Sequence, residues 1–274
     1  MSDLKTALVT GASSGMGKAI AKQLLKDGYT VAVAARRLEA MQDLVDLGAH
    51  AFRMDIADTN SLTAAVAEIR EKVGAIDILV NNAGFGLYGS VEEVPIDDAR
   101  YQFEVNLFGL AHLTQLLIPD MRKAGRGKII NISSMGGRIY TPLGAWYHAT
   151  KHALEGFSDC LRIELKGFGI DVVVVQPGGI DTGFADVLDG PMQKNSGEGP
   201  YKRMVERIAE GTRQMYERGR ASPPELIAGV VSDAVKARRP KTRYVAGFAA
   251  KPLMWIRRWL GDRAFDRLML SQVK

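Results

Sequence analysis

Short runs of apolar, mostly β-branched residues alternate along the chain with longer segments in which apolar residues recur at helical spacing. The runs predict seven buried strands, at 4–10, 30–35, 49–54, 76–81, 128–133, 170–176 and 243–246. The segments between them predict helices, notably near 15–27, 59–73, 98–124 and 146–167. Strands that alternate with helices in this way are typical of a parallel sheet with helices on both faces.

The domain organisation follows from this pattern and from a length of 274 residues, which suits one large domain. We predict a single Rossmann-type α/β domain over residues 1–250, with a doubly wound, parallel, seven-stranded sheet. The least regular stretch, about 183–222, begins just after the sixth predicted strand. Because ligands in such sheets lie beyond the carboxyl ends of the strands, we expect this insertion to cover a substrate.

Residues 251–274 predict a separate, basic amphipathic helical tail. Apolar residues recur there at helical spacing, and two tryptophans lie beside them: Leu253, Ile256, Leu260, Ala264 and Leu268, with Trp255 and Trp259. The tail holds four of the five net positive charges of the chain. Such a helix can pack on a neighbouring subunit or over a cleft, or it can lie on an anionic membrane surface. We favour packing.

Composition excludes several classes of site. The single cysteine, Cys160, excludes an intramolecular disulfide and a multi-cysteine metal site, and the four histidines show no ligand cluster. No run approaches 18 apolar residues, and the first residues lack the pattern of a signal peptide. We therefore expect a cytoplasmic protein without a metal. The sequence shows no separate basic motif that would recognise nucleic acid.

A glycine-rich turn follows the first predicted strand and opens a helix. Its residues are Gly11, Ser13, Ser14, Gly15, Met16 and Gly17. Glycines let backbone amides approach a pyrophosphate closely, and a helix N-terminus favours the negative charge. The second predicted strand ends in Arg36 and Arg37, where NAD-binding folds usually place a carboxylate. Guanidinium groups can hold a 2′-phosphate, so we predict NADP(H) as the cofactor, with Arg36 as the principal contact.

Two further motifs complete a recognisable set. Asn81-Asn82-Ala83-Gly84 ends the fourth predicted strand, and Tyr147-x-x-x-Lys151 lies on a predicted helix, where residues four apart share one face. With the glycine turn, in this order, they resemble the short-chain dehydrogenase/reductase family over roughly residues 4–182. The lysine ammonium is expected to lower the pKa of the Tyr147 phenol and so make it a general acid and base.

The resemblance implies further site residues. Ser134 would polarise the substrate oxygen, with Ser133 as the alternative, and Asn106 would hold a water that relays protons from Lys151. Cofactor contacts would come from the glycine turn and from Arg36, Arg37, Asp55, Ile56, Asn82, Ala83, Gly84, Tyr147, Lys151, Pro177, Gly178, Ile180 and Thr182. It also implies a homodimer or homotetramer, packed through the helices near 98–124 and 146–167.

We therefore predict an NADP(H)-preferring oxidoreductase that transfers a hydride between the nicotinamide and a ketone, aldehyde or secondary alcohol. The substrate is expected to be small and lipophilic, because its candidate lining is mostly apolar: Phe85, Leu87, Tyr88, Met135, Leu143, Trp146, Phe184 and Leu188. The alternative is a regulatory Rossmann protein that senses a cofactor without turnover. The presence of Asn106, Ser134, Tyr147 and Lys151 together favours the enzyme.

Overall fold

The computed structural model describes residues 5–182 and 184–273, and for 184–189 the backbone only. In this part of the chain, seven parallel strands form one sheet in the order β3-β2-β1-β4-β5-β6-β7. The strands are β1 (Thr6–Thr10), β2 (Thr30–Ala35), β3 (His50–Arg53), β4 (Ile78–Asn81), β5 (Gly127–Ile132), β6 (Ile170–Pro177) and β7 (Arg243–Ala246). The predicted Rossmann-type, doubly wound sheet is confirmed, and the strand limits differ from the prediction by at most two residues. Leu4, where the first strand was expected to begin, lies outside the described residues.

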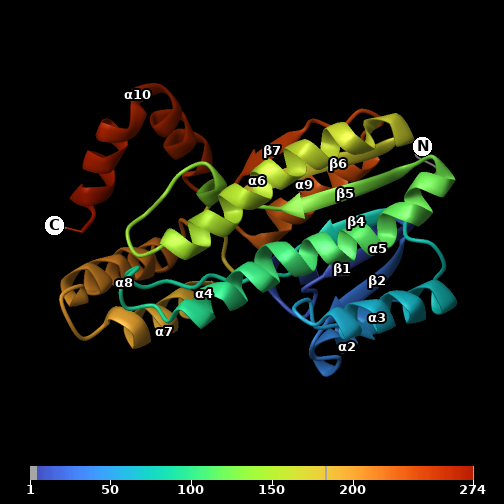
Figure 1. Cartoon of the computed structure of the whole chain (residues 1–274), viewed down its shortest axis with the longest axis horizontal. Helices are drawn as coiled ribbons and strands as arrows, with labels where there is room; N and C mark the ends of the chain where they lie inside the picture. Colours follow the sequence, from blue (N-terminus) through green and yellow to red (C-terminus); the bar gives the residue numbers. More distant parts are fainter. Residues whose placement is uncertain (1–4, 183, 274) are drawn as a thin grey trace.

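Helices cover both faces of the sheet (Figure 1). On one face, apolar side chains of the strands pack against α1 (Gly15–Lys26), α2 (Gln42–Val45) and α9 (Pro224–Lys236). On the other they pack against α3 (Thr59–Lys72), α5 (Gly109–Ala124) and α6 (Ala145–Leu165). Because both faces are buried, the strands are nearly continuous apolar runs, which is the pattern that predicted them.

The site for a ligand is set by the order of the strands. From β1 the chain runs outward to β2 and β3, then returns to β4 on the other side of β1. At this reversal the loops after β1 and β4 diverge onto opposite faces and leave an opening beyond the carboxyl ends of the strands.

The helix predicted over 98–124 is interrupted. It forms α4 (Ile96–Phe103), a π-helical turn (Glu104–Phe108) and α5. The turn contains Asn106, whose buried amide group bonds to the backbone of Phe85. A π turn rotates the side chains that follow it, and such turns occur often at functional sites. Helical periodicity alone does not reveal it, because one extra residue in a turn shifts the pattern only slightly.

The stretch 183–222, the least regular in sequence, contains two helices, α7 (Phe184–Ser196) and α8 (Lys202–Glu217). The C-terminal tail also differs from a single amphipathic helix. It forms α10 (Ala250–Ser271), which is broken at Gly261 by a left-handed φ of 75°. Among the described residues, no helix has the length and apolar character needed to cross a bilayer.

Candidate active site

A cleft of about 570 Å³ runs along the carboxyl ends of β1, β2, β4 and β5, at the reversal of strand order. Most of the predicted site residues line it: Gly11, Ser13, Ser14, Gly15, Met16, Arg36, Arg37, Asp55, Ile56, Asn82, Ala83, Gly84, Tyr147, Lys151 and Thr182. Other lining residues were not predicted as site residues, among them Thr10, Ala34, Ala35, Met54, Tyr101 and Val105. The cleft therefore joins the phosphate-type turn, the two arginines and the Tyr-Lys pair in one continuous space.

The glycine turn requires its glycines for two different reasons. Gly11 has a left-handed φ of 65°, and a Cβ placed on it would lie 2.9 Å from the Cα of Ala83. A Cβ on Gly17 would overlap the carbonyl oxygen of Gly11, so Gly17 lets α1 begin directly against the turn. The first amides of α1 have no capping bond from the side chain of Ser14. They are available to an anionic group beyond the helix N-terminus.

Thr10 and Asn82 fix the turn against the loop after β4. The Thr10 Oγ1 accepts hydrogen bonds from the amides of Asn82 and Ala83, each over 3.1 Å. The Asn82 Nδ2 in turn donates to the carbonyl oxygens of Thr10 and Gly11, over 3.0 and 3.3 Å. Asn82 thus holds the shape of the turn as well as bordering the cleft. Thr10 is a site residue that the sequence analysis missed, although its place just before the first glycine signals it.

The far end of the cleft carries the groups expected near an adenosine. Arg36 and Arg37 are exposed and border the cleft just after β2. The Asp55 carboxylate accepts a hydrogen bond from the amide of Ala57 over 3.1 Å, and the Asp55 amide donates to Ser61 Oγ over 2.9 Å. The loop after β3 is therefore held in place by its own side chains, with Ile56 beside it in the cleft.

Tyr147 and Lys151 lie one turn apart on α6, with the Lys151 Nζ 5.9 Å from the centre of the tyrosine ring. Both side chains are buried. Burial raises the pKa of Tyr147, while a hydrogen bond with the Ser134 side chain acts in the opposite direction. Burial lowers the pKa of Lys151 to about 8, against the attraction of Glu155. The expected lowering of the Tyr147 pKa is thus absent from the protein alone, because desolvation outweighs the hydrogen bond with Ser134.

The two candidate serines are distinguished by their surroundings. Ser134 lies two residues after the end of β5, directly before a turn at Met135–Gly137, and its Oγ accepts a hydrogen bond from the Gly136 amide over 3.0 Å. Ser133 is buried next to Gly137, and its hydroxyl lacks a hydrogen-bond partner among the described residues. Ser133 borders the cleft, whereas Ser134 is the serine that interacts with Tyr147. The two hydroxyls therefore have different neighbours.

Asn106 lies behind the cleft and positions its wall. Its Oδ1 accepts from the Phe85 amide over 3.0 Å, and its Nδ2 donates to the Phe85 carbonyl over 2.9 Å and to Thr150 Oγ1 over 3.1 Å. These bonds tie the loop after β4 to α6, three residues after Tyr147. A Cβ on Gly84 would lie 3.0 Å from the Asn106 Oδ1, so this glycine allows the close approach.

Among its described residues, the segment after β6 contributes Thr182 to the cleft. Thr182 borders it and lies against the glycine turn, where a Cβ on Gly15 would be 3.1 Å from the Thr182 Cβ. The predicted contacts Pro177, Gly178 and Ile180 lie outside the lining. Ile180 is buried in the main core, and its carbonyl accepts from the Tyr216 hydroxyl over 3.1 Å. Ile180 thus anchors the segment after β6 to the core of the domain and does not border the cleft.

Apolar side chains pack around Tyr147 beyond the lining of the cleft. Tyr88, Leu143 and Tyr147 pack with Met192 of α7 and Val205 of α8 in one buried cluster. The tip of α7 is bonded to the loop before α4, since the Ser196 Oγ accepts from the Ser90 amide over 2.8 Å. The insertion therefore packs against the surroundings of Tyr147. The side chains of Phe184 and Leu188 lie outside the described residues.

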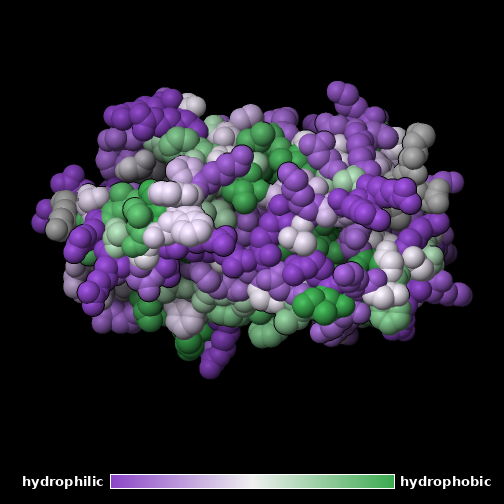
Figure 2. All heavy atoms as spheres, turned by 90° about the horizontal axis from the view of Figure 1, so that it is seen from above, coloured by the Kyte–Doolittle hydropathy of each residue, from purple (hydrophilic) through white to green (hydrophobic). Residues whose placement is uncertain are grey.

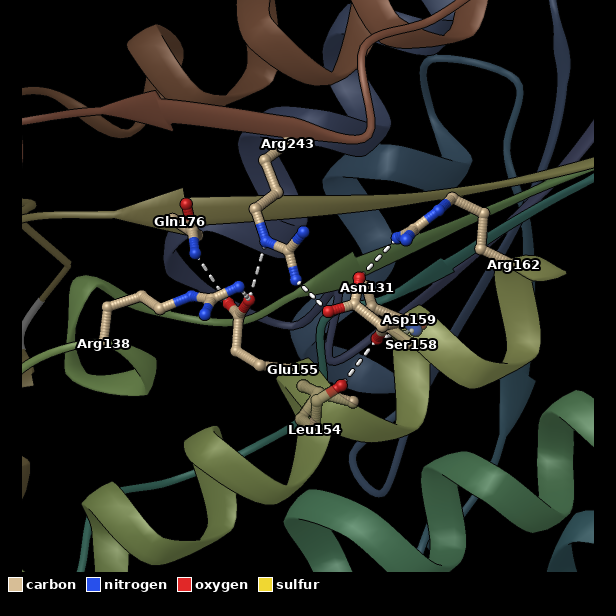
Figure 3. A network of polar contacts seen from close by, with 9 residues as sticks. All are labelled: Asn131, Arg138, Leu154, Glu155, Ser158, Asp159, Arg162, Gln176 and Arg243. Carbon is tan, nitrogen blue, oxygen red and sulfur yellow. Dashed lines mark hydrogen bonds and ion pairs between the residues drawn. The ribbon is translucent and has the colours of Figure 1, made fainter.

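A network centred on the buried carboxylate of Glu155 joins α6 to β6, β7 and the turn after Ser134 (Figure 3). The Glu155 carboxylate accepts from Gln176 Nε2 over 2.8 Å and from Arg243 Nε over 2.9 Å, and it pairs with Arg138 over 3.2 Å. Arg243 also donates to Asp159 over 2.7 Å. Sequence reasoning missed this network, because its members are far apart in the chain and match no motif.

His148 is a buried packing residue. The His148 Nε2 accepts from the Thr141 amide over 3.0 Å, so its Nδ1–H donates to the Gly136 carbonyl over 2.9 Å. Burial lowers the pKa of His148 to about 4, which keeps the ring neutral. Within the described residues, no group of three potential ligands is placed to hold a metal ion.

Comparison with known proteins agrees with this geometry. The short chain dehydrogenase family pattern matches residues 5–191. An NADPH-dependent 3-dehydrocapnine reductase from Ornithobacterium rhinotracheale is 34% identical over 99% of this chain and 98% of its own. A 3-ketodihydrosphingosine reductase from Bacteroides thetaiotaomicron is 40% identical over 65% of each chain.

Solved structures give the same family. A short chain dehydrogenase/reductase from Burkholderia phymatum, in complex with NAD, superposes with a TM-score of 0.80 and is 26% identical over 93% of each chain. The glycine turn, the Tyr-Lys pair and the strand order described above belong to this architecture. The chain is a member of the short-chain dehydrogenase/reductase family of nicotinamide-dependent oxidoreductases.

Proposed function

We propose that the protein is an NADP(H)-preferring carbonyl reductase or alcohol dehydrogenase that acts on a small lipophilic substrate, with Tyr147 as general acid and base. One observation carries the proposal. A single cleft connects Arg36 and Arg37 at one end with Tyr147 and Lys151 at the other, and the glycine turn lies between them. A dinucleotide needs these three features in this order: a phosphate contact on the ribose, a pyrophosphate turn and a proton donor.

The residues of the cleft fit the nucleotide. Gly11, Gly17 and Gly84 let the backbone around the cleft pack closely, because a Cβ on each would meet neighbouring protein atoms. The first amides of α1 have no capping bond from the Ser14 side chain and are available to the pyrophosphate. Arg36 and Arg37 supply cations where an NAD-specific site would carry a carboxylate. The relative named as NADPH-dependent supports this choice, while the relative with bound NAD shows that the family accepts both nucleotides.

The bound nicotinamide would exchange a hydride with the substrate carbon. In the direction of reduction, Tyr147 donates its proton to the carbonyl oxygen, and the Ser134 hydroxyl hydrogen-bonds to the same oxygen. The Lys151 ammonium stabilises the phenolate that results. Asn106 holds the loop at Phe85 that forms the facing wall, and the water that it was expected to hold stays a prediction.

The substrate class is inferred from the Tyr147 end of the cleft. Phe85, Tyr101 and Val105 line the cleft near Tyr147, and Tyr88, Leu143, Met192 and Val205 pack around Tyr147 in a buried apolar cluster. A polyol would leave its hydroxyls without partners against such a wall. 3-Ketodihydrosphingosine, the substrate in the name of one relative, carries a ketone on a long alkyl chain and is a suitable first compound to test.

Parallel titration with NADPH and NADH tests the cofactor. We expect NADPH to bind more tightly, and Arg36→Ala to weaken NADPH binding by about ten- to a hundredfold with little effect on NADH. Arg37→Ala measures the contribution of the second arginine. Tighter binding of NADH would contradict the assignment of Arg36, and binding of neither nucleotide would contradict the proposed reaction.

A further inference from the structure

The two halves of α10 have an inner face that packs on the domain. Phe265 and Met269, from the second half, are buried with Ile139. Leu253 and Ile256, from the first half, pack at the edge of the same cluster. The packing predicted for the tail therefore accounts for only part of its apolar surface.

The outer face of α10 exposes large apolar side chains. Trp255 is 57% exposed, Trp259 65% and Leu260 57%, all in the half that precedes the bend at Gly261. Leu270, near the end of the second half, is 48% exposed. Seen from above, hydrophobic side chains gather at the surface over the end of the molecule that carries α10 (Figure 2). Tryptophans are the side chains that lie most favourably at a membrane–water interface.

Cationic side chains surround these residues. Lys251, Arg258, Arg263 and Arg267 are all exposed on α10, and the Arg258 guanidinium lies 5.3 Å from the centre of the Trp259 ring. The helix also carries two exposed carboxylates. Asp262 pairs with Arg257, and Asp266 accepts a hydrogen bond from the Tyr140 hydroxyl over 2.7 Å. The exposed surface of α10 therefore combines large apolar side chains with more cations than carboxylates.

We propose that this outer face of α10 docks the protein on an anionic lipid bilayer, with Trp255 and Trp259 inserted at the headgroup level. The exposed cations match the negative surface of such a bilayer. A second copy of this chain fits less well, because a two-fold contact through this face would bring its cations together. The bend at Gly261 turns the second half back onto the domain, so the helix lies on the bilayer and does not enter it further.

α10 packs against a segment that borders the candidate active site. Its inner face contacts Met135, Ile139 and Tyr140, in the segment that directly follows Ser134. Docking would bring this segment, and with it the Tyr147 end of the cleft, close to the lipid. The inference about docking stands on the surface of α10 and does not depend on the proposed reaction.

Vesicle flotation with the full chain tests the proposal. The probes are vesicles of equal parts phosphatidylglycerol and phosphatidylcholine, compared with vesicles of phosphatidylcholine alone, in about 0.15 M salt. We expect the wild type to float with the anionic vesicles only. Trp255→Ser with Trp259→Ser, and separately Arg258→Gln with Arg263→Gln, should each reduce the floated fraction roughly tenfold or more.

Matched controls separate docking from loss of folding or of charge. Leu47 is as exposed as Trp255 and lies far along the chain, so Leu47→Ser should float like the wild type. Arg238→Gln with Arg239→Gln removes two exposed cations that follow α9 and should also float normally. Circular dichroism and the NADPH titration check that each variant is folded.

Three outcomes would overturn the proposal. The first is a wild type that does not float with anionic vesicles, and the second is a tryptophan variant that floats as well as the wild type. The third is a tryptophan variant whose particle mass in solution, measured by light scattering, differs from that of the wild type. The last result would assign the face to a subunit contact. Quenching by brominated lipid gives an independent reading, since Trp255 and Trp259 are two of only three tryptophans in the chain.

Discussion

The Lys151 Nζ donates a hydrogen bond to the carbonyl oxygen of Ile132 over 2.9 Å. This bond aims the ammonium at the end of β5, the strand that leads into Ser133 and Ser134. The lysine thus links the helix that carries Tyr147 to the strand end that carries the serines. Burial removes the ammonium from water, and the hydrogen bond to the Ile132 carbonyl does not offset this loss of solvation. The pKa of Lys151 therefore falls to about 8.

Replacing Lys151 with methionine should therefore separate activity from stability. We expect kcat/KM to fall by roughly a hundredfold or more, because the charge that stabilises the phenolate is lost. The free energy of unfolding at pH 7 should stay equal or rise, since a buried ammonium is replaced by an apolar side chain of similar length. Steady-state kinetics and urea denaturation measure the two effects. A large loss of stability would show that the lysine serves packing.

The Glu155 network allows a comparison of two carboxylates that share Arg243. The Glu155 side chain is 4% exposed, whereas the Asp159 side chain is 37% exposed. Glu155→Gln should cost about 3 kcal/mol of unfolding free energy, because it leaves buried donors facing a weaker acceptor. Asp159→Asn should cost about 1 kcal/mol or less. Equal losses in chemical denaturation would contradict the dependence on burial.

His148 predicts a dependence of stability on pH. The folded pKa of about 4 lies below the ordinary value of 6.5, so between these values the unfolded chain binds more protons. Stability attributable to His148 is therefore present above pH 6.5 and is lost as the pH falls towards 4. Between pH 7 and pH 5 we expect a loss of about 2 kcal/mol from this residue. His148→Gln should remove that part of the dependence, while His50→Gln, at an exposed position, should leave it unchanged.

The predicted homodimer or homotetramer would use the outer surfaces of α5 and α6. Ile163 on α6 is 72% exposed, and Phe108 at the start of α5 is 55% exposed. Ile163→Asp should shift the mass measured by light scattering towards the monomer, because a buried charge at such a contact is costly. Leu47→Asp is the exposed control. A wild type that is already monomeric would contradict the predicted assembly.

Much of this fold could be predicted from the sequence, and the reasons are local. Strands such as β2 are buried on both faces and read as uninterrupted apolar runs, and the glycine turn and Tyr147-x-x-x-Lys151 are contiguous motifs. The Glu155 network could not be predicted, since Gln176 and Arg243 reach it only through the pairing of β6 with β7. The cytoplasmic location stays a prediction, because no contact in the fold encodes it.

The pKa of Tyr147 is another property that could not be predicted from the sequence. Spacing along α6 correctly places Lys151 beside the ring, but the balance between burial and charge depends on residues from several elements. Tyr88 is one of them, its ring centre 5.8 Å from that of Tyr147. Sequence identifies which groups meet, whereas their electrostatic balance follows from the packed structure.

The NADPH-dependent reduction of 3-ketodihydrosphingosine and simpler lipophilic ketones, by the wild type and by Tyr147→Phe, tests the proposed reaction most directly. We predict turnover by the wild type with at least one such ketone. Tyr147→Phe should lower kcat by roughly a hundredfold or more while NADPH still binds, because the variant loses the proton donor and keeps the shape of the cleft. Turnover that survives in Tyr147→Phe would contradict the role of this tyrosine, and with it the central claim.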